Sequence, residues 1–212
     1  MSIDGQQALM SLAKISGLYL KSQQGGPHKR DQLDVSLTGV KNGRDCHPWK
    51  QFLIIPQATL DRFDITGQDL KVDAVIKSDF DLHTLPSGSV IKIGDVKIRL
   101  TFHCEPCAKI KHLGSVKRFS HHRGYHSQVL SAGQIKMGDS LSLLEEVYEP
   151  IPYRLSDRIQ WYLAQNPKPI FAADLADRIG FSASYCRAIP RAIEHRDDID
   201  KQLIIYKNKL VT

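Results

Sequence analysis

Residues 85–104 carry the strongest β-sheet signal in the chain. Apolar residues at 90, 91 and 93 precede a Gly94-Asp95 pair, and apolar side chains follow it at every second position. Period-two spacing places such side chains on one face of a strand, and a Gly-Asp pair between two strands predicts a hairpin. We therefore expect two antiparallel strands joined by a tight turn in this segment.

Three other segments of the first 150 residues show similar patterns. Residues 12–21 read as a strand with a glycine interruption, and 51–55 read as a short buried strand that ends at Pro56. Residues 128–144 repeat the order of strand, glycine turn and strand. Many short strands with glycine turns favour a β-barrel or sandwich, so we expect a mainly β first domain over residues 1–150.

The pattern changes after residue 150, where apolar residues fall at helical spacing. We expect one helix after Leu155, a second that ends at Gly180, and a third that is capped by Ser182 and stopped or kinked at Pro190. Residues 203–212 read as two short strands around Lys-Asn-Lys. Three helices and a hairpin predict a small winged helix-turn-helix domain over residues 151–212.

Composition narrows the class of protein. Hydrophobic residues make up 42% and charged residues 25% of the 212 residues, which is typical of a globular chain and excludes a disordered one. The sequence has no apolar run of about 18 residues and no secretory pattern at its start, so we expect no membrane association. Four cysteines are too few for a disulfide framework, which favours a reducing, cytoplasmic location.

Positive charge is concentrated in one segment. Residues 106–138 contain no Asp or Glu and six Lys or Arg residues, which equals the net charge of +6 of the whole chain. Such a field attracts a phosphate, an oxoanion or a nucleic-acid backbone, whereas a solvated basic surface is the alternative interpretation.

A Cys104-x-x-Cys107 pair lies at the start of this basic segment, directly after a predicted strand. Nearby cations favour the thiolate, which is both a ligand for soft metals and a sulfur nucleophile. The spacing of Cys104, Cys107, His122 and His126 also fits a Cys2His2 zinc site, which we keep as an alternative. A buried structural role is the expected one for Cys104.

Several motifs, in order, resemble those of the MOSC domain family, whose members include the C-terminal domains of molybdenum cofactor sulfurases. The resemblance covers residues 12–147. Its motifs are Gly-Arg-Asp-Cys-His at 43–47, Gly-Gln-Asp-Leu at 67–70, the glycine-bounded strand at 85–94, Glu-Pro-Cys at 105–107, Arg-Gly-Tyr at 123–125 and Gly-Gln-Ile-Lys-Met-Gly-Asp at 133–139. Gln68 and Asp69 depart from the Glu and Asn of the family's Gly-Glu-Asn-Leu turn.

The resemblance implies a β-barrel that binds the molybdenum cofactor, molybdopterin, with Cys107 as the catalytic residue and molybdenum ligand. It implies that the cofactor phosphate is held by basic residues, for which the candidates are Lys109, Lys111, Arg118 and Arg123. Asp45 and His47 are further cofactor-binding candidates, with a hydrogen-bonded turn as the alternative. No pyridoxal-phosphate lysine motif is visible, so pyridoxal phosphate is not expected from this chain.

Two reactions follow from the resemblance. Relatives reduce amidoximes and other N-hydroxylated bases, so Cys107 is expected to hold molybdenum while a small N-hydroxylated substrate is reduced. The other hypothesis is that Cys107 carries sulfur as a persulfide between a sulfur donor and an acceptor.

Residues 153–193 show a weaker resemblance to the DNA-binding winged helix of alkyltransferase-like proteins. The Pro-Cys-His-Arg alkyl-acceptor motif is absent, so no alkyl transfer is expected. Residues 151–212 contain ten Lys or Arg against seven Asp or Glu, a small excess for a DNA partner, which Arg187 would approach. The alternative function is therefore a nucleic-acid-binding protein, and a structural or protein-docking appendage is the other interpretation of this domain.

Overall fold

The computed structural model describes residues 8–22, 25–44 and 46–206. The chain divides into two compact units, Met1–Pro150 and Ile151–Thr212. The strands of the first unit are β1 (Ala8–Lys21), β2 (Pro27–Arg30), β3 (Gln32–Ser36), β4 (Gly39–Val40), β5 (Phe52–Pro56), β6 (Ala74–Ser78), β7 (Ser89–Ile93), β8 (Val96–His103), β9 (Tyr125–Ser131), β10 (Gly133–Lys136) and β11 (Ser140–Val147). Its helical segments are η1 (Pro48–Lys50), α1 (Gln57–Phe63), α2 (Gly67–Leu70), η2 (Leu82–Thr84), η3 (Ala108–Leu113) and η4 (Val116–Phe119), of which the η segments are 3-10 helices.

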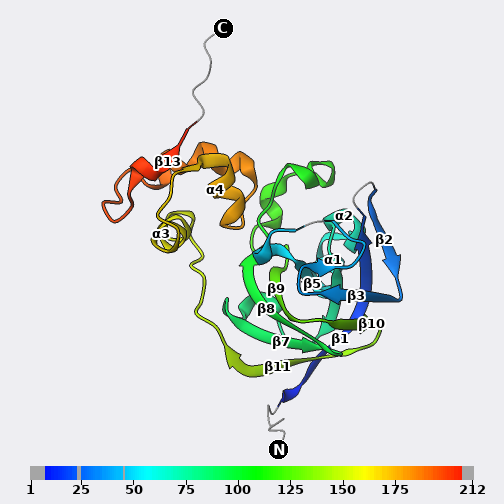
Figure 1. Ribbon diagram of the computed structural model, residues 1–212. Helices are drawn as coiled ribbons and strands as arrows, with labels where there is room; N and C mark the ends of the chain where they lie inside the picture. Colours follow the sequence, from blue (N-terminus) through cyan, green and yellow to red (C-terminus); the bar gives the residue numbers. More distant parts are fainter. Residues whose placement is uncertain (1–7, 23–24, 45, 207–212) are drawn as a thin grey trace, which may run out of the picture. The chain divides into compact units, whose positions relative to one another are not determined.

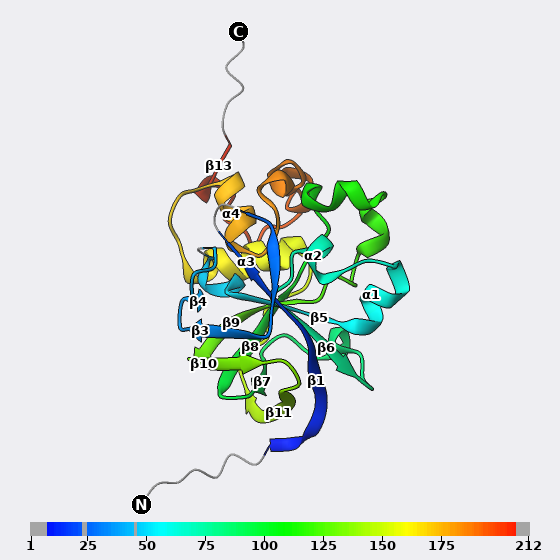
Figure 2. The ribbon, with the colours of Figure 1, turned by 90° about the vertical axis from the view of Figure 1, so that its right-hand side faces the viewer.

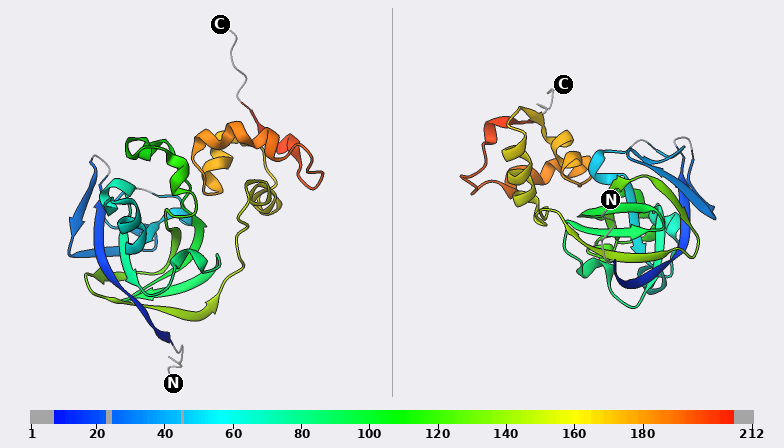
Figure 3. Two further views of the ribbon diagram at one scale, coloured as in Figure 1. Left: turned by 180° about the vertical axis from the view of Figure 1, so that it is seen from behind. Right: turned by 60° about the horizontal axis from the view of Figure 1, so that its bottom comes forward.

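The first unit is built on a closed β-barrel (Figures 1 and 3). Strands β11, β7, β8, β9, β5, β6 and β1 are hydrogen-bonded in that order, and β1 pairs with β11 to close a seven-stranded barrel. All these pairs are antiparallel except β5 with β6. The mainly β architecture predicted from the sequence is confirmed.

The predicted strands form where the apolar patterns place them. Strands β7 and β8 pair across Gly94-Asp95, with Ile93 opposite Val96. Gly94 has φ +55, a conformation that glycine adopts without steric cost. The predicted hairpin and its turn are therefore confirmed, and the structure adds the register.

Strand β5 is buried on both faces. Phe52 and Ile54 belong to the cluster that fills the barrel, whereas Leu53 and Ile55 belong to a second apolar cluster outside it. That second cluster also contains Leu70, Cys104, Ile110 and Phe119, and it is covered by α1, α2, η3 and η4. These helical segments gather at one end of the barrel (Figures 1 and 2). The continuous apolar run of β5 thus reflects two cores separated by one layer of sheet.

The second unit contains α3 (Leu155–Gln165), β12 (Ile170–Phe171), α4 (Ala172–Arg178), η5 (Ala183–Ala188), α5 (Ile189–Ala192), η6 (Lys201–Leu203) and β13 (Ile204–Ile205). Its helices share an apolar core that includes Ile159, Leu175, Ile179 and Ile189. Buried Arg158 spans this unit, because it donates from Nε to the Pro152 carbonyl at 2.8 Å and from Nη1 to the Ile179 carbonyl at 3.1 Å.

One local prediction for this unit was wrong. Ser182 precedes a 3-10 segment and makes no side-chain capping bond. That segment ends at Ala188 and α5 begins at Ile189, so the helical run changes next to Pro190, which lies in the first turn of α5. Proline suits that position because the first turn leaves its amide groups without helical partners. Strand β13 pairs in parallel with β12, and residues 207–212 of the expected hairpin lie outside the described residues, so the winged-helix prediction is not confirmed.

No helix in the part of the chain that the structure describes is long and apolar enough to cross a membrane.

Candidate functional site at the end of the barrel

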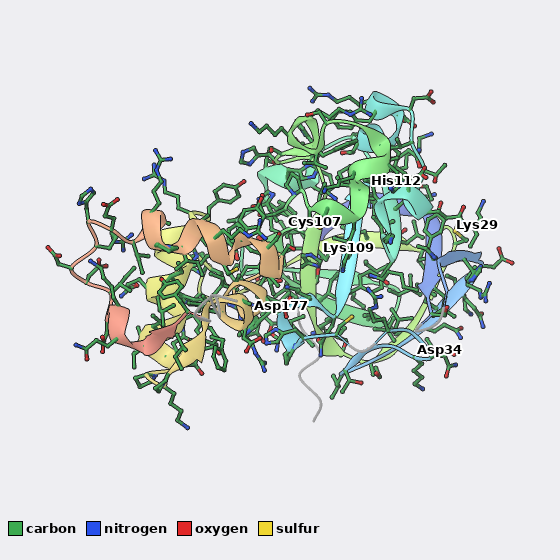
Figure 4. The ribbon with its side chains drawn as sticks, turned by 90° about the horizontal axis from the view of Figure 1, so that it is seen from above. Lys29, Asp34, Cys107, Lys109, His112 and Asp177 are labelled. Carbon is green, nitrogen blue, oxygen red and sulfur yellow. The ribbon has the colours of Figure 1, made fainter. Side chains whose placement is uncertain are left out.

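The two cysteines of the Cys-x-x-Cys pair have different environments. The backbone amide of Cys104 donates to the Gly124 carbonyl at 2.9 Å, so its side chain is fixed at the end of β8 within the outer apolar cluster. Burial raises the pKa of the Cys104 thiol above its ordinary value, although the Arg123 charge opposes this. Cys107 is only half-buried and immediately precedes η3 (Figure 4). Cys107 is therefore the accessible thiol of the pair.

Arg123 approaches the Cys107 sulfur from inside the protein. Its side chain is buried, and Nη1 lies 3.6 Å from the Cys107 Sγ. The same guanidinium donates from Nη1 to the Glu105 carbonyl at 3.0 Å and from Nη2 to the Leu70 carbonyl at 3.1 Å. Arg123 Nε is also buried and has no hydrogen-bond partner among the described residues. The guanidinium thus joins the cysteine loop to α2 and places a permanent positive charge beside the accessible sulfur.

The Gly-Gln-Asp-Leu motif forms the short helix α2 beside this arginine. The Asp69 carboxylate accepts hydrogen bonds from the backbone amide and the hydroxyl of Thr66, at 2.8 and 2.6 Å. The hydroxyl and then the amide of Thr66 lower the pKa of Asp69 below its ordinary value. A Cβ on Gly67 would lie 2.5 Å from the Tyr19 ring, so only glycine fits there. The departure from Asn to Asp at residue 69 therefore retains a side chain that closes the helix start.

The other basic residues predicted from the sequence are placed in two groups. Lys109 and Lys111 are exposed on η3, immediately after Cys107. Arg118 is exposed on η4, where its guanidinium lies over the rings of Phe63 and Phe119, at 5.5 and 4.7 Å from their centroids. The structure therefore gathers Cys107, Lys109, Lys111 and Arg123 in one region and stacks Arg118 on aromatic side chains instead.

The Gly-Arg-Asp-Cys-His motif at 43–47 is described only in part. Asp45 lies outside the described residues. His47 precedes η1, where its Nδ1 accepts a hydrogen bond from the backbone amide of Trp49 at 3.3 Å. His47 is therefore used in a local turn, which is the alternative that its sequence pattern left open.

The four residues of the zinc alternative do not assemble as a metal site. The Nε2 of His122 lies 3.2 Å from Nη1 of Arg62, a permanently charged neighbour that disfavours a bound cation. Within the described ranges, no group of three or more His, Cys, Asp or Glu side chains is arranged to hold a metal ion. The geometry thus gives no support to a site made of Cys104, Cys107, His122 and His126.

Sequence reasoning missed His83, which lies next to the Arg-Gly-Tyr motif. Its ring is 8% exposed, its Nδ1 lies 2.8 Å from Asp81 Oδ1, and its Nε2 accepts the Gly124 amide at 3.0 Å. Burial raises the pKa of Asp81, but the hydrogen bonds from the amide and ring of His83 outweigh it, so the pKa is lowered overall. Only the short Asp-x-His spacing signals this pair, and nothing local links it to Gly124, 41 residues away.

The barrel and its accessible thiol define the class of protein to which the first unit belongs. It is a closed β-barrel domain with a cysteine loop and an arginine at one end. Residues 45–142 match the model of the MOSC domain family. The chain therefore contains a MOSC domain.

Two solved structures, the YuaD protein and a hypothetical protein, show the same fold at low sequence identity, and YiiM is similar only below a TM-score of 0.5. The YuaD protein from Bacillus subtilis superposes with a TM-score of 0.56 and 16% identity, over 65% of this chain and 97% of that one. The crystal structure of a hypothetical protein gives a TM-score of 0.53 and 13% identity, over 89% of this chain and 90% of the other. YiiM from Escherichia coli gives a TM-score of 0.48 and 15% identity, over 84% and 91% of the two chains. A comparison with curated protein sequences found no match.

Proposed function

We propose that this protein binds the molybdenum cofactor at the end of the barrel and uses it to reduce small N-hydroxylated substrates, with Cys107 as the molybdenum ligand. One observation carries the proposal: the half-buried Cys107 lies at the end of the barrel with the Arg123 guanidinium 3.6 Å from its sulfur. MOSC domains occur in proteins related to this cofactor, which is the chemical context for such a thiol.

The residues present fit the cofactor in their donor chemistry. A thiolate sulfur is a suitable ligand for a soft metal centre, and the partnerless Nε of Arg123 leaves one buried donor available near it. Lys109 and Lys111 are exposed on the segment that follows Cys107, so their ammonium groups would hold the cofactor phosphate. When bound, the cofactor would supply the two-electron redox chemistry.

The protein's own residues would hold and orient the cofactor. Cys107 would bind the metal through its sulfur. Arg123 would hold the Glu105–Cys107 loop through its hydrogen bond to the Glu105 carbonyl and would balance the negative charge on the sulfur. The outer apolar cluster beneath the loop keeps this arrangement rigid.

The test is cofactor content. Protein purified anaerobically from a host that makes the cofactor is expected to contain molybdenum and pterin, and Cys107→Ser is expected to lose the molybdenum. Cys104→Ala is the matched control, because that thiol is buried and is expected to leave the content unchanged. Wild-type protein without either component, or a Cys107→Ser variant with full content and turnover, would overturn the proposal.

Sulfur transfer is the second candidate reaction, and the accessibility of Cys107 favours it. The Cys107 sulfur would attack the outer sulfur of a donor persulfide, so that a new S–S bond forms at Cys107 as the donor S–S bond breaks. The donor then leaves as a thiolate and Cys107 carries a persulfide. Mass spectrometry of the Cys107 peptide after treatment with a low-molecular-weight persulfide tests this reaction, because a carrier is expected to gain one sulfur at Cys107, and a Cys107 that stays unmodified would contradict it.

Nucleic-acid binding by the second unit is the alternative function, and one feature favours it. Residues 179–193 contain no Asp or Glu, and Arg187 and Arg191 are exposed on η5 and α5. Salt-dependent retention of duplex DNA, reduced in Arg187→Ala/Arg191→Ala, is the expected outcome if this unit binds nucleic acid. Equal retention by the variant would contradict it.

A further inference from the structure

His83 connects an acidic residue to the backbone of the arginine that faces Cys107. Asp81 Oδ1 lies 2.8 Å from His83 Nδ1 and also accepts the His83 backbone amide at 2.9 Å. On the other side of the ring, Nε2 lies 3.0 Å from the amide nitrogen of Gly124, the residue that follows Arg123. Asp81 and the Arg123–Gly124 turn are thus linked through one buried imidazole.

The identity of these atoms fixes the protonation of the ring. A backbone amide can only donate, so His83 Nε2 must accept and carries no proton. The ring proton is then on Nδ1, where the Asp81 carboxylate accepts it. His83 is therefore neutral with its proton on Nδ1, a tautomer that the two hydrogen bonds select together.

The Arg123–Gly124 turn is also restrained by features other than its hydrogen bond to His83. Gly124 has φ +78, and its carbonyl accepts the Cys104 amide at 2.9 Å. The turn is therefore held by His83 on its amide side and by the cysteine loop on its carbonyl side. Because the Arg123 side chain starts from this turn, a shift of the turn would move the guanidinium away from the Cys107 sulfur.

We propose that Asp81 and His83 form a positioning pair that fixes the Arg123–Gly124 turn and thereby holds the Arg123 guanidinium against the Cys107 sulfur. The pair acts through Arg123, and its importance for catalysis rests on the function proposed for Cys107. Two further rings lie against the His83 ring: His103 stacks on it with ring centroids 6.0 Å apart, and His122 lies edge-on at 5.9 Å. Neither occupies the two ring nitrogens, which are committed to Asp81 and Gly124.

The first test is the tautomer itself. Long-range ¹H–¹⁵N NMR of labelled protein at neutral pH is expected to show His83 protonated at Nδ1 and unprotonated at Nε2. A ring protonated at Nε2 would overturn the proposal, because it could not accept the Gly124 amide.

The second test is the reactivity of Cys107 toward iodoacetamide, followed by mass spectrometry of its peptide. The sulfur attacks as an anion, and Arg123 Nη1 lies 3.6 Å from it, so Arg123→Gln, which removes this neighbouring positive charge, is expected to slow the reaction severalfold. His83→Phe keeps a ring in the same space but removes the acceptor for Gly124, and it is expected to slow alkylation similarly although Arg123 is intact. An unchanged rate in folded His83→Phe would contradict the positioning role.

Two substitutions at Asp81 provide the matched control. Asn keeps an oxygen that can accept both the amide and the ring N–H of His83, so Asp81→Asn is expected to retain the wild-type rate, whereas Asp81→Ala is expected to resemble His83→Phe. Equal alkylation rates in Asp81→Asn and Asp81→Ala would contradict the positioning role of Asp81 and His83. Circular dichroism verifies folding, and the NMR test on wild-type protein decides the question if a variant unfolds. None of these measurements needs molybdenum. The positioning role of Asp81 and His83 can therefore be confirmed in a protein that binds no cofactor, and it can be contradicted in a protein that does.

Discussion

Gly124 lies so close to Ile54 that a Cβ at residue 124 would be 2.0 Å from the Ile54 carbonyl oxygen. This contact brings β5 against the turn that carries Arg123, so it links the barrel wall to the candidate site. Gly124 also has φ +78, where residues with a side chain are strained.

We expect Gly124→Ala to destabilise the first unit by more than about 4 kcal/mol, because a backbone clash is added to the conformational strain. Gly114→Ala is the matched control. Gly114 has φ +97, but a Cβ added there would meet no atom of the described residues within 4 Å, so only the strain, about 1–2 kcal/mol, applies. Urea denaturation measures both variants, and similar losses in the two would show that the Ile54 contact is unimportant.

The barrel could be predicted from the sequence because its signals are local. The period-two pattern around Gly94-Asp95 indicated the right turn, and the apolar run before Pro56 marked a strand that is buried on both faces. In each case the pattern that predicts the element lies within a few residues, because strand and turn preferences are local properties of the sequence.

The candidate site could be predicted only in part, because its contacts join distant segments. The Cys-x-x-Cys pair indicated a reactive sulfur, but the burial of Arg123 depends on carbonyls at Leu70 and Glu105, 53 and 18 residues away. Charge alone grouped Arg118 with Arg123, although the structure stacks Arg118 on Phe63. No local pattern distinguishes a buried arginine from an exposed one.

Arg123→Met is expected to destabilise the first unit by about 3 kcal/mol, since it removes the donors to the Leu70 and Glu105 carbonyls from a buried location. Arg118→Met is the matched control. Arg118 is exposed and its guanidinium stacks on aromatic rings, so its loss is expected to cost about 0.5 kcal/mol. Chemical denaturation measures the unfolding free energy of both variants. An Arg123→Met variant as stable as Arg118→Met would contradict the proposal that the guanidinium stabilises the fold by joining the cysteine loop to α2.

Arg158 is expected to determine the stability of the second unit. Arg158→Met removes its donors to the Pro152 and Ile179 carbonyls and its contact with the Phe181 ring, at a cost of about 3 kcal/mol. In differential scanning calorimetry the transition of this unit is expected to move to lower temperature while that of the barrel stays in place. Arg154→Met, at an exposed residue of the same segment, is the control. A shift of both transitions by the same amount would contradict this prediction.

His122 is expected to make the first unit less stable in mild acid. Burial of the ring, and then the charge of Arg62, lower the pKa of His122 below its ordinary value. The folded protein therefore binds this proton less tightly than the unfolded chain does, so the contribution is fully present above the ordinary histidine pKa and is lost as the pH falls through and below it. Unfolding free energy measured from about pH 7.5 to about pH 5 is expected to fall less steeply in His122→Asn than in wild type. His28→Asn, which changes an exposed histidine of β2 that does not act on His122, is expected to keep the wild-type slope. If His122→Asn followed the wild-type curve throughout this range, the unfavourable placement of the His122 proton beside Arg62 would be refuted.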